Sequence, residues 1–449
     1  KMQHSQIIFH IELEKEDNIN PSKNVKFGSN QFSFLLPKEV TLEEIHPDHL
    51  ALVSVLVCHP FIGERIVFPK GVSKQFFKAH EIVTRYIVEN VDETLQPWEP
   101  SRKSRPALAF SGGADSTAAL ALMPSNTMSV FLDRPLKFFD LYNKEAVYKA
   151  CDYLIENGYE VMKVISNLEF VRDPIGFPVD VANACPAILL ASHMGFDAIA
   201  FGTIMESAFG VGHKNYRNYP TGNHFSHLGG IFRAAGLPFF QVVSGVSEVG
   251  TAIINRDSSI GHIAHSCMRG KWRSPCKNCW KCFRKIFLDS VVHNKELNNK
   301  EIKKLFKIEE ARRFLSEFPI KHENVLTYFT SKYIEIFNLN INDGGIMSLL
   351  TKRVRGDVMD VNWMEKYFPL MFETIPEKYR VELKENLEKY LQPMNKNEEN
   401  TVLNWNMSGM LDDQSYQNLH HEFCNEMLNP IDNQKNMKKF WLRRYFQKR

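Results

Sequence analysis

The central part of the chain predicts an α/β fold built on a doubly wound parallel sheet. From Pro106 onward, short apolar segments such as "ALAF", "MSVFLD" and "EVMKVIS" alternate with segments of helical periodicity. Strands of a parallel sheet are continuously apolar because helices cover both faces, whereas half-exposed strands alternate apolar and polar residues. The segments "DAIAFGT" and "FFQVVS" extend the same pattern.

Three regions are expected along the 449 residues, since one domain takes roughly 150 residues. Residues 1–100 predict an N-terminal α+β domain, with strands at "QIIFHIELE", "NQFSFLLP" and "ERIVFP" and helices near 47–58 and 72–90. The α/β domain is expected over 106–290 and a helical C-terminal domain over 291–449.

Helices of the two later regions are predicted from periodicity and end signals. The first is expected over 116 to about 123, the second opens near Asn143 and ends at Gly158, and Pro186 suits the first turn of a third. In the C-terminal region, 377–391 places apolar residues on one helical face: Tyr379, Leu383, Leu387 and Tyr390.

Composition is typical of a soluble protein, with 44% hydrophobic and 24% charged residues. The formal charge of +3 does not by itself indicate a nucleic-acid partner. No apolar run reaches the length of a membrane span, and charges interrupt the N-terminal apolar stretch, so a cytoplasmic enzyme is expected. The basic, aromatic segment 435–449 predicts a docked amphipathic helix, with nucleic acid or a partner protein as the alternative contact.

The sequence "SGGADST" at 111–117 lies in the first strand-to-helix turn of the α/β region. Ligands of open parallel sheets bind at the carboxyl ends of strands, and glycines there let backbone N–H groups converge on a phosphate. The segment lacks the Lys-Ser/Thr pair of a Walker loop and the G-x-G-x-x-G of a dinucleotide site. The residues predict phosphate binding, with an ordinary capped turn as the alternative. The glycines are Gly112 and Gly113, and the hydroxyl groups belong to Ser111, Ser116 and Thr117.

Four of the eight cysteines fall at C-x8-C-x2-C-x2-C spacing: Cys267, Cys276, Cys279 and Cys282. This spacing predicts a closed, structural Zn²⁺ site of four thiolates. An iron–sulfur cluster and unrelated buried thiols are the alternatives. Basic residues crowd the segment and would offset the thiolate charge: Arg269, Lys271, Arg273, Lys277 and Lys281. The other cysteines, Cys58, Cys151, Cys185 and Cys424, are expected to be small packing residues.

The pattern S-G-G-x-D-S resembles the PP-loop of the ATP pyrophosphatase superfamily, whose fold is adenine nucleotide alpha-hydrolase-like. The resemblance implies that the loop holds the pyrophosphate of ATP, that Asp115 helps to place Mg²⁺, and that Asp133 lies near the adenine. The pyrophosphate-binding residues implied in this way are Ser111, Gly112, Gly113, Asp115, Ser116 and Thr117.

Together with the cysteines and Arg284, the loop resembles the 7-cyano-7-deazaguanine synthase (QueC) family over residues 106–288. The family implies structural zinc and ATP-dependent adenylation of an oxygen, which leads from a carboxylate to an amide and a nitrile on a deazapurine. Similar larger proteins occur in anti-phage defence, and some modify a protein terminus. The segment that follows Gly202 departs from the family pattern, which leaves the substrate open.

Adenylation requires cations at the phosphates, and the candidate catalytic residues are Asp115, Ser116, Lys214 and Arg217, with Arg134 as a further cation. Glu206 is expected either to hold Mg²⁺ or substrate, or to cap a loop. The expected function is therefore an ATP-dependent, C–N bond-forming ligase acting on a small molecule or a protein terminus, with oligomeric state left open. Two alternatives are a PP-loop RNA-modifying thiolase, in which Cys185 would serve as nucleophile, and a non-catalytic nucleotide-binding partner in a defence complex.

Overall fold

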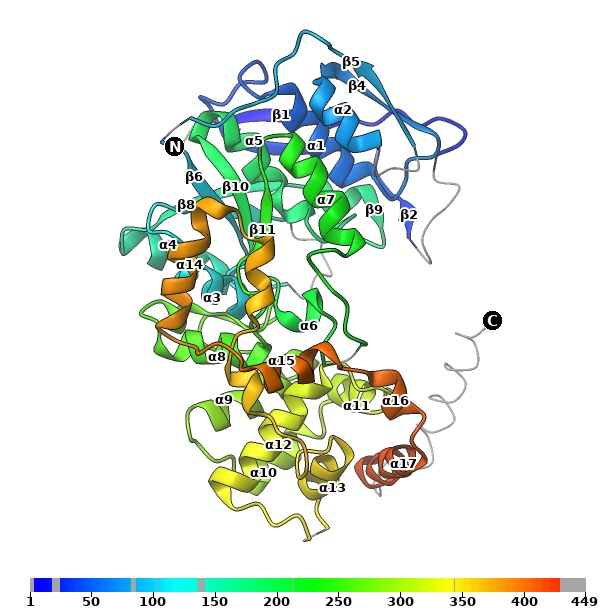
Figure 1. Ribbon diagram of the computed structural model, residues 1–449, viewed down its shortest axis with the longest axis vertical. Helices are drawn as coiled ribbons and strands as arrows, with labels where there is room; N and C mark the ends of the chain where they lie inside the picture. Colours follow the sequence, from blue (N-terminus) through cyan, green and yellow to red (C-terminus); the bar gives the residue numbers. More distant parts are fainter. Residues whose placement is uncertain are drawn as a thin grey trace.

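The computed structural model describes residues 4–17, 25–81, 86–101, 103–135, 142–212, 214–342 and 344–428. Its centre is a seven-stranded sheet in the order β1-β3-β8-β7-β6-β10-β11 (Figure 1). The bounds are β1 His4–His10, β3 Gln31–Pro37, β6 Arg105–Phe110, β7 Met128–Asp133, β8 Glu160–Ser166, β10 Phe196–Phe201 and β11 Phe239–Gln241.

Strands β6, β7, β8, β10 and β11 pair in parallel, which confirms the predicted α/β class. The chain runs outward from β6 through β7 to β8, then returns to place β10 on the other side of β6. The strand order therefore reverses between β6 and β10. The crevice at such a reversal is where open α/β sheets bind ligands.

Helices cover both faces of this sheet (Figure 1). Alternate residues of β6 show the two cores: Ala107 and Ala109 belong to one buried apolar cluster, and Leu108 and Phe110 to the other. The first cluster includes residues of α1 Pro47–Cys58, α5 Cys185–Met194 and α7 Asn223–Ala234. The second includes residues of α3 Ala114–Leu122, α4 Glu145–Glu156 and α8 Glu248–Asp257. Strands buried on both sides explain the continuous apolar runs of the sequence.

The N-terminal strands extend the central sheet. β1 and β3 are antiparallel, and β3 pairs with β8 through Phe34 opposite Ser166 and Leu35 opposite Ile165. A separate parallel pair is formed by β4 Arg65–Val72 and β5 Ile87–Val91. The helix expected near 72–90 is therefore wrong at its C-terminal part: α2 is described over Lys74–Glu81, and the segment "IVENV" instead pairs with β4. This pairing is a tertiary contact that local periodicity does not reveal.

Beyond the cysteine segment, the described residues form helices and no strand, as expected. The predicted apolar face is confirmed in α14 Glu377–Glu388, where Tyr379, Leu383 and Leu387 are buried. Instead of staying with the other C-terminal helices, α14 packs on α3 beside the sheet (Figure 1). Residues 435–449 lie outside the described part of the chain.

The remaining elements are short or lie in the C-terminal region. The strands are β2 Lys26–Phe27 and β9 Arg172–Asp173, which pair with each other. The helices are α6 Met205–Ala208, α9 Trp280–Val292, α10 Asn299–Leu305, α11 Glu309–Leu315, α12 Glu323–Phe337, α13 Ile346–Arg353, α15 Lys396–Leu403, α16 Met407–Leu411 and α17 Gln414–Leu428. The 3-10 turns are η1 Leu168–Val171, η2 Ala182–Ala184, η3 Gly261–Ile263, η4 Asn362–Glu365 and η5 Pro369–Thr374. Among the described residues, no helix is long and apolar enough to cross a membrane.

Candidate functional site

The glycine loop, residues 111–113, joins β6 to α3 at the reversal of strand order. Gly112 has φ +69°, and a Cβ atom there would lie 2.7 Å from Val147 Cγ2. Gly113 is the N-cap residue of α3, and no side chain caps this helix end. Uncapped N–H groups and the positive end of the helix dipole make such a turn suitable for an anion.

Two hydroxyl groups hold the glycine loop in shape. Ser116 Oγ donates to the carbonyl oxygen of Gly113 at 3.1 Å and lies 3.0 Å from Ser111 Oγ. The Ser111 N–H donates to Ser116 Oγ at 3.3 Å. Thr117, by contrast, is fully buried and does not line the adjoining pocket. Of the predicted loop residues, Ser111, Gly113, Asp115 and Ser116 line the pocket, whereas Gly112 and Thr117 do not.

Gly202, directly after β10, closes the other side of the crevice. A Cβ atom at this position would lie 2.8 Å from both the Asp115 carbonyl oxygen and the Ser116 nitrogen. Only glycine allows the end of β10 to approach the start of α3 so closely. The sequence offers no local signal for this role, because the contact joins two separate βα turns.

A pocket of about 170 Å³ opens between these turns. Its lining includes polar groups of the glycine loop, of α3 and of the segment before η2. The lining residues are Ala109, Ser111, Gly113, Asp115, Ser116, Asp180, Val181, Asn183, Phe201, Gly202, Thr203 and Lys281. Asp180 and Asn183 were not predicted from the sequence, and Asp180 accepts from His224 Nε2 at 2.9 Å when that nitrogen carries the proton.

Lys281 is the one cation among the described residues that line this pocket. It lies in the first turn of α9, between Cys279 and Cys282. Its side chain makes no hydrogen bond or ion pair with the other residues that the structure describes, although its charge contributes to lowering the pKa of Glu248. From the sequence, Lys281 was predicted only to offset the charge of the thiolates, and its position between two cysteines was the available signal.

The structure places the other predicted cations elsewhere. Lys214 is exposed and outside the pocket lining, and Arg217 Nε donates to the Ala208 carbonyl oxygen at 2.7 Å. Arg134 pairs with Glu169 at 2.9 Å. These three side chains are therefore not brought to the glycine loop.

Asp133, like those three cations, lies outside the pocket lining. It ends β7 but is buried, and its two carboxylate oxygens accept from Lys144 Nζ and Tyr148 OH, each at 2.6 Å. Because both carboxylate oxygens already accept hydrogen bonds at the start of α4, Asp133 has a structural role: it joins the end of β7 to that helix.

The four predicted cysteines come together. Their sulfur atoms all lie within 4.8 Å of one another, with 3.8 Å between Cys267 and Cys279 and 3.7 Å between Cys276 and Cys282. A tetrahedral Zn²⁺ site with Zn–S bonds of about 2.3 Å has sulfur–sulfur edges of about 3.8 Å. The backbone N–H groups of Asn278 and Cys282 donate to Cys276 and Cys279 sulfur, each at 3.4 Å. The donor set and its geometry fit zinc, and the four thiolates leave no coordination position open.

The cysteine segment contacts the glycine loop directly. The His265 N–H donates to the Gly112 carbonyl oxygen at 2.9 Å, and the Asn143 N–H donates to the Met268 carbonyl oxygen at 2.7 Å. The thiol cluster thus lies beside the pocket. It is continuous in the chain with the segment whose His265 contacts Gly112 and with the first turn of α9, which contains Lys281.

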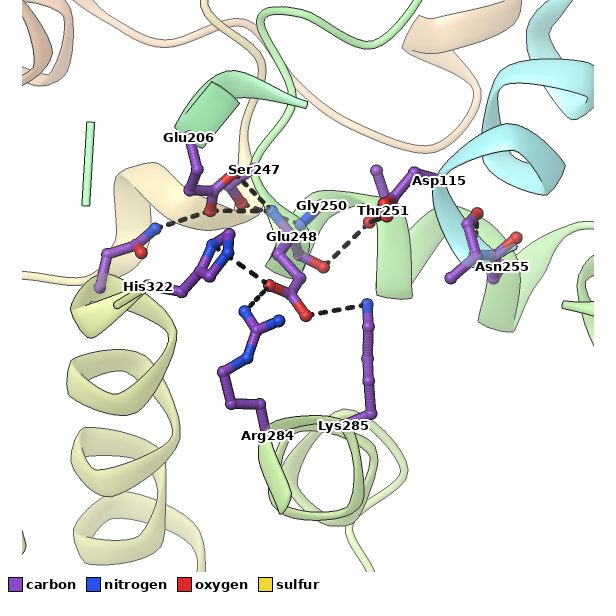
Figure 2. A network of polar contacts seen from close by, with 12 residues as sticks. Asp115, Glu206, Ser247, Glu248, Gly250, Thr251, Asn255, Arg284, Lys285 and His322 are labelled. Carbon is purple, nitrogen blue, oxygen red and sulfur yellow. Dashed lines mark hydrogen bonds and ion pairs between the residues drawn. The ribbon is translucent and has the colours of Figure 1, made fainter. Parts of the chain in front are cut away.

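A buried polar network lies next to the loop (Figure 2). Glu248, at the start of α8, pairs with Arg284 and lies 3.3 Å from Lys285 Nζ and 3.9 Å from His322 Nδ1. Burial alone would raise the pKa of Glu248, but the combined positive charges of Arg284, Lys285, His322 and Lys281 lower it. Glu248 is therefore a buried carboxylate that joins α8 to α9 and α12.

Glu206 caps α8 from the other side of this network (Figure 2). Its Oε1 accepts from the Glu248 N–H at 3.0 Å and from Asn324 Nδ2 at 2.7 Å. Burial and the charge of Glu248 raise the pKa of Glu206 to about 7. The side chain is absent from the pocket lining, so the contacts match the capping role expected as one of its two alternatives. The network reaches the pocket through Thr251, whose hydroxyl donates to Asp115 Oδ1 at 3.4 Å.

The fold and site define a parallel α/β protein with a polar pocket at its strand reversal and a four-cysteine cluster beside it. Residues 227–406 match a family model described as a family of unknown function (DUF6395). The matched stretch begins in α7 and includes the cysteines, Lys281, Glu248 and its cationic partners, but neither the glycine loop nor Glu206. Neither the curated proteins nor the solved structures gave a match.

Proposed function

We propose that this protein is an ATP pyrophosphatase-type enzyme that adenylates an oxygen of its substrate. The observation that supports the proposal most directly is the pocket at the reversal between β6 and β10, lined by the glycine loop, Asp115 and Lys281. Such crevices bind nucleotides in open α/β sheets, and the S-G-G-x-D-S loop resembles the PP-loop of this superfamily.

The size of the pocket indicates which end of the nucleotide enters it. Pockets that enclose a drug-sized ligand hold about 300–1,000 Å³, whereas this one holds about 170 Å³. It suits the β- and γ-phosphates, with the nucleoside lying across the rim. In the reaction, the substrate oxygen attacks the α-phosphorus, the bond from that phosphorus to the bridging α–β oxygen breaks, and pyrophosphate leaves.

The loop residues and Asp115 would divide the work of holding the leaving pyrophosphate. Backbone N–H groups at the start of α3 donate to its oxygens, and the hydroxyl groups of Ser111 and Ser116 fix the loop for that contact. Asp115 would hold Mg²⁺, which needs only one or two protein carboxylates when phosphates and waters complete its shell. Bound there, Mg²⁺ supplies charge neutralisation at the phosphates.

For the acceptor, we propose a carboxylate or amide oxygen on a deazapurine-like molecule or on a protein terminus. This rests on the resemblance of the loop and cysteines to 7-cyano-7-deazaguanine synthases, which also suggests a place in anti-phage defence. The segment after Gly202 is where the sequence departs from that family, and Gly202 itself lines the pocket. Substrate identity is therefore expected to depend on this segment.

The sulfur-transfer alternative has less support. Cys185, its candidate nucleophile, is fully buried at the start of α5, and burial raises the pKa of its thiol. A nucleophilic cysteine needs an accessible thiolate. No cysteine lines the described pocket, so the geometry favours ligase chemistry.

The test is incubation of the protein with ATP, Mg²⁺, ammonia and candidate deazapurine carboxylic acids, following AMP, ADP and pyrophosphate. We expect AMP and pyrophosphate in equal amounts, and loss of turnover in Asp115→Asn with the fold unchanged by circular dichroism. Asp152→Asn, at an exposed ion pair with Lys163, is the matched control and should keep full activity. Release of ADP and phosphate would overturn the proposal.

A further inference from the structure

We infer that Lys281 is the phosphate-binding cation of the pocket, and that the metal held by the four cysteines positions it there. The inference rests on the proposed function, since it concerns the same pocket. It assigns the cysteine cluster a part in nucleotide affinity as well as in folding.

A pocket that receives two phosphates needs more positive charge than the glycine loop provides. The cations predicted from sequence, Lys214, Arg217 and Arg134, lie outside the pocket lining. Arg284 and Lys285 both pair with Glu248 in the buried network and are absent from the pocket lining. Lys281 lines the pocket together with Ser111 and Gly113. No ion pair joins its side chain to a carboxylate of the described residues, although its charge contributes to lowering the pKa of Glu248.

The backbone of Lys281 is fixed on both sides. Cys279 is the N-cap residue of α9, and Cys282 lies one residue after Lys281. Between them, the Trp280 ring is buried against Phe283 and Phe314, and the Trp280 backbone N–H donates to Glu310 Oε1 at 3.3 Å. A metal bound to the two flanking thiolates therefore sets the direction in which the Lys281 side chain leaves the helix.

The charge at the start of α9 is the reverse of what a helix prefers. Its first turn contains Lys281 and no acidic residue, although the positive end of the helix dipole disfavours a cation there. An anion in the pocket would relieve this repulsion. The negative charge of the thiolates does not by itself explain a lysine at position 281. Lys277, which is exposed and lies between Cys276 and Cys279, can offset that charge as well.

The experiment measures binding of inorganic pyrophosphate with Mg²⁺ to the zinc-loaded full chain by titration calorimetry. We expect Lys281→Met to weaken binding by about ten- to a hundredfold, as removal of a hydrogen bond to a charged group does. Lys281→Arg should restore much of the affinity. Lys277→Met is the matched control, and it removes the same charge from the same segment without touching the pocket, so its affinity should stay within about twofold of the wild type.

A second arm tests the role of the metal. A chelator selective for zinc over magnesium should weaken pyrophosphate binding much more in the wild type than in Lys281→Met, because the variant has already lost the group that the metal positions. Circular dichroism reports whether the zinc-free chain stays folded. If it unfolds, the comparison of Lys281→Met with Lys277→Met in zinc-loaded protein decides.

The outcomes separate the inference from the proposed function. Tight binding by the wild type with equal affinity in Lys281→Met overturns the inference and leaves the proposed function standing. Equal losses in Lys281→Met and Lys277→Met also overturn it, since general charge would then account for the effect. Absence of pyrophosphate and ATP binding by the wild type overturns both.

Discussion

Gly112 and Gly113 are neighbours with different physical requirements. Gly112 adopts φ +69° and has no room for a Cβ beside Val147, whereas Gly113 has φ −78° and a Cβ there would lie 3.3 Å from Ser111 Oγ. The first glycine is required by the backbone and by packing. The second leaves space at the pocket.

The difference gives a prediction for Gly112→Ala. We expect it to destabilise the fold by about 2–4 kcal/mol, from left-handed strain and from the clash with Val147 together, and to abolish pyrophosphate binding. Gly158→Ala is the control: its φ is +83° but a Cβ meets nothing within 4 Å, so only the backbone strain of about 1–2 kcal/mol applies. Thermal unfolding measures both, and an equal loss of stability in the two variants would contradict the packing argument.

Glu206 carries a second prediction at the scale of a residue. Its pKa is about 7 in the folded protein, against an ordinary value of 4.5, because it is buried beside Glu248. The folded state therefore keeps this proton to higher pH than the unfolded chain does. Its contribution to stability is complete below about pH 4.5 and is lost as the pH rises through 7.

Glu206→Gln should remove this pH dependence. Glutamine can keep an oxygen at the position that accepts from the Glu248 N–H and Asn324. As the pH rises from 5 to 8, the free energy of unfolding of the variant should therefore increase by about 1–3 kcal/mol relative to that of the wild type. Denaturant unfolding at several pH values measures the difference. Glu335→Gln, at a mostly exposed side chain, is the control. A wild-type-to-variant difference that stays constant over this range would show that Glu206 is not protonated in the folded state.

At the scale of an element, the cysteine segment fixes the start of α9 against the glycine loop. Cys276 and Cys279 precede the helix, Cys282 lies in its first turn, and the His265 N–H reaches the Gly112 carbonyl oxygen. Short segments without a core of their own depend on such a metal for their structure.

We therefore expect about one zinc per chain and loss of that zinc in Cys279→Ser. The thermal midpoint should fall by several degrees, and residues 265–276 should become accessible to protease, because their anchoring is lost. Cys424→Ser, at a half-buried thiol outside the cluster, should keep its zinc and serves as the control. Iron in the metal analysis, or a full zinc content in Cys279→Ser, would contradict the assignment.

At the scale of the whole molecule, α14 ties the C-terminal region to the sheet. Asp197 of β10 accepts from Ser104 Oγ at 2.7 Å and also from Lys378 Nζ and Tyr379 OH of α14. Asn386 of the same helix donates to the Leu122 carbonyl oxygen at 2.9 Å. A helix from the end of the chain therefore completes the covering of the central sheet.

This arrangement predicts a large effect for Asp197→Ala. The variant removes the acceptor of Ser104 Oγ and Tyr379 OH and the charge partner of Lys378, which keeps its contacts with Ser104. We expect a loss of about 2–4 kcal/mol in the free energy of unfolding. Because α14 and the sheet pack together, we expect them to unfold in one transition. The unfolding midpoint should therefore fall by the same amount whether it is followed by far-UV circular dichroism or by tryptophan fluorescence. Asp152→Ala, at a half-exposed ion pair, should change stability by less than about 1 kcal/mol. A shift seen by one probe alone would show that α14 unfolds separately.

Much of the fold could be predicted because its signals are local. The buried parallel strands produce continuous apolar runs, and the C-x8-C-x2-C-x2-C spacing predicted a cluster that the sulfur positions confirm. The glycine loop was found in the same way, since a turn with φ +69° at Gly112 has a local sequence signature. The β5 strand was missed because its partner, β4, is separated from it by a helix.

By itself, the sequence determined the class of the sheet, the loop at its first turn and the metal-ligand set, because each depends on residues close together in the chain. Only the tertiary structure decided that β1 and β3 join the sheet, that α14 covers it, and that Lys281 lines the pocket while Lys214, Arg217 and Asp133 do not. These facts depend on contacts between segments far apart in sequence. Packing and burial of charge select such contacts, and they leave no periodicity or spacing in the chain.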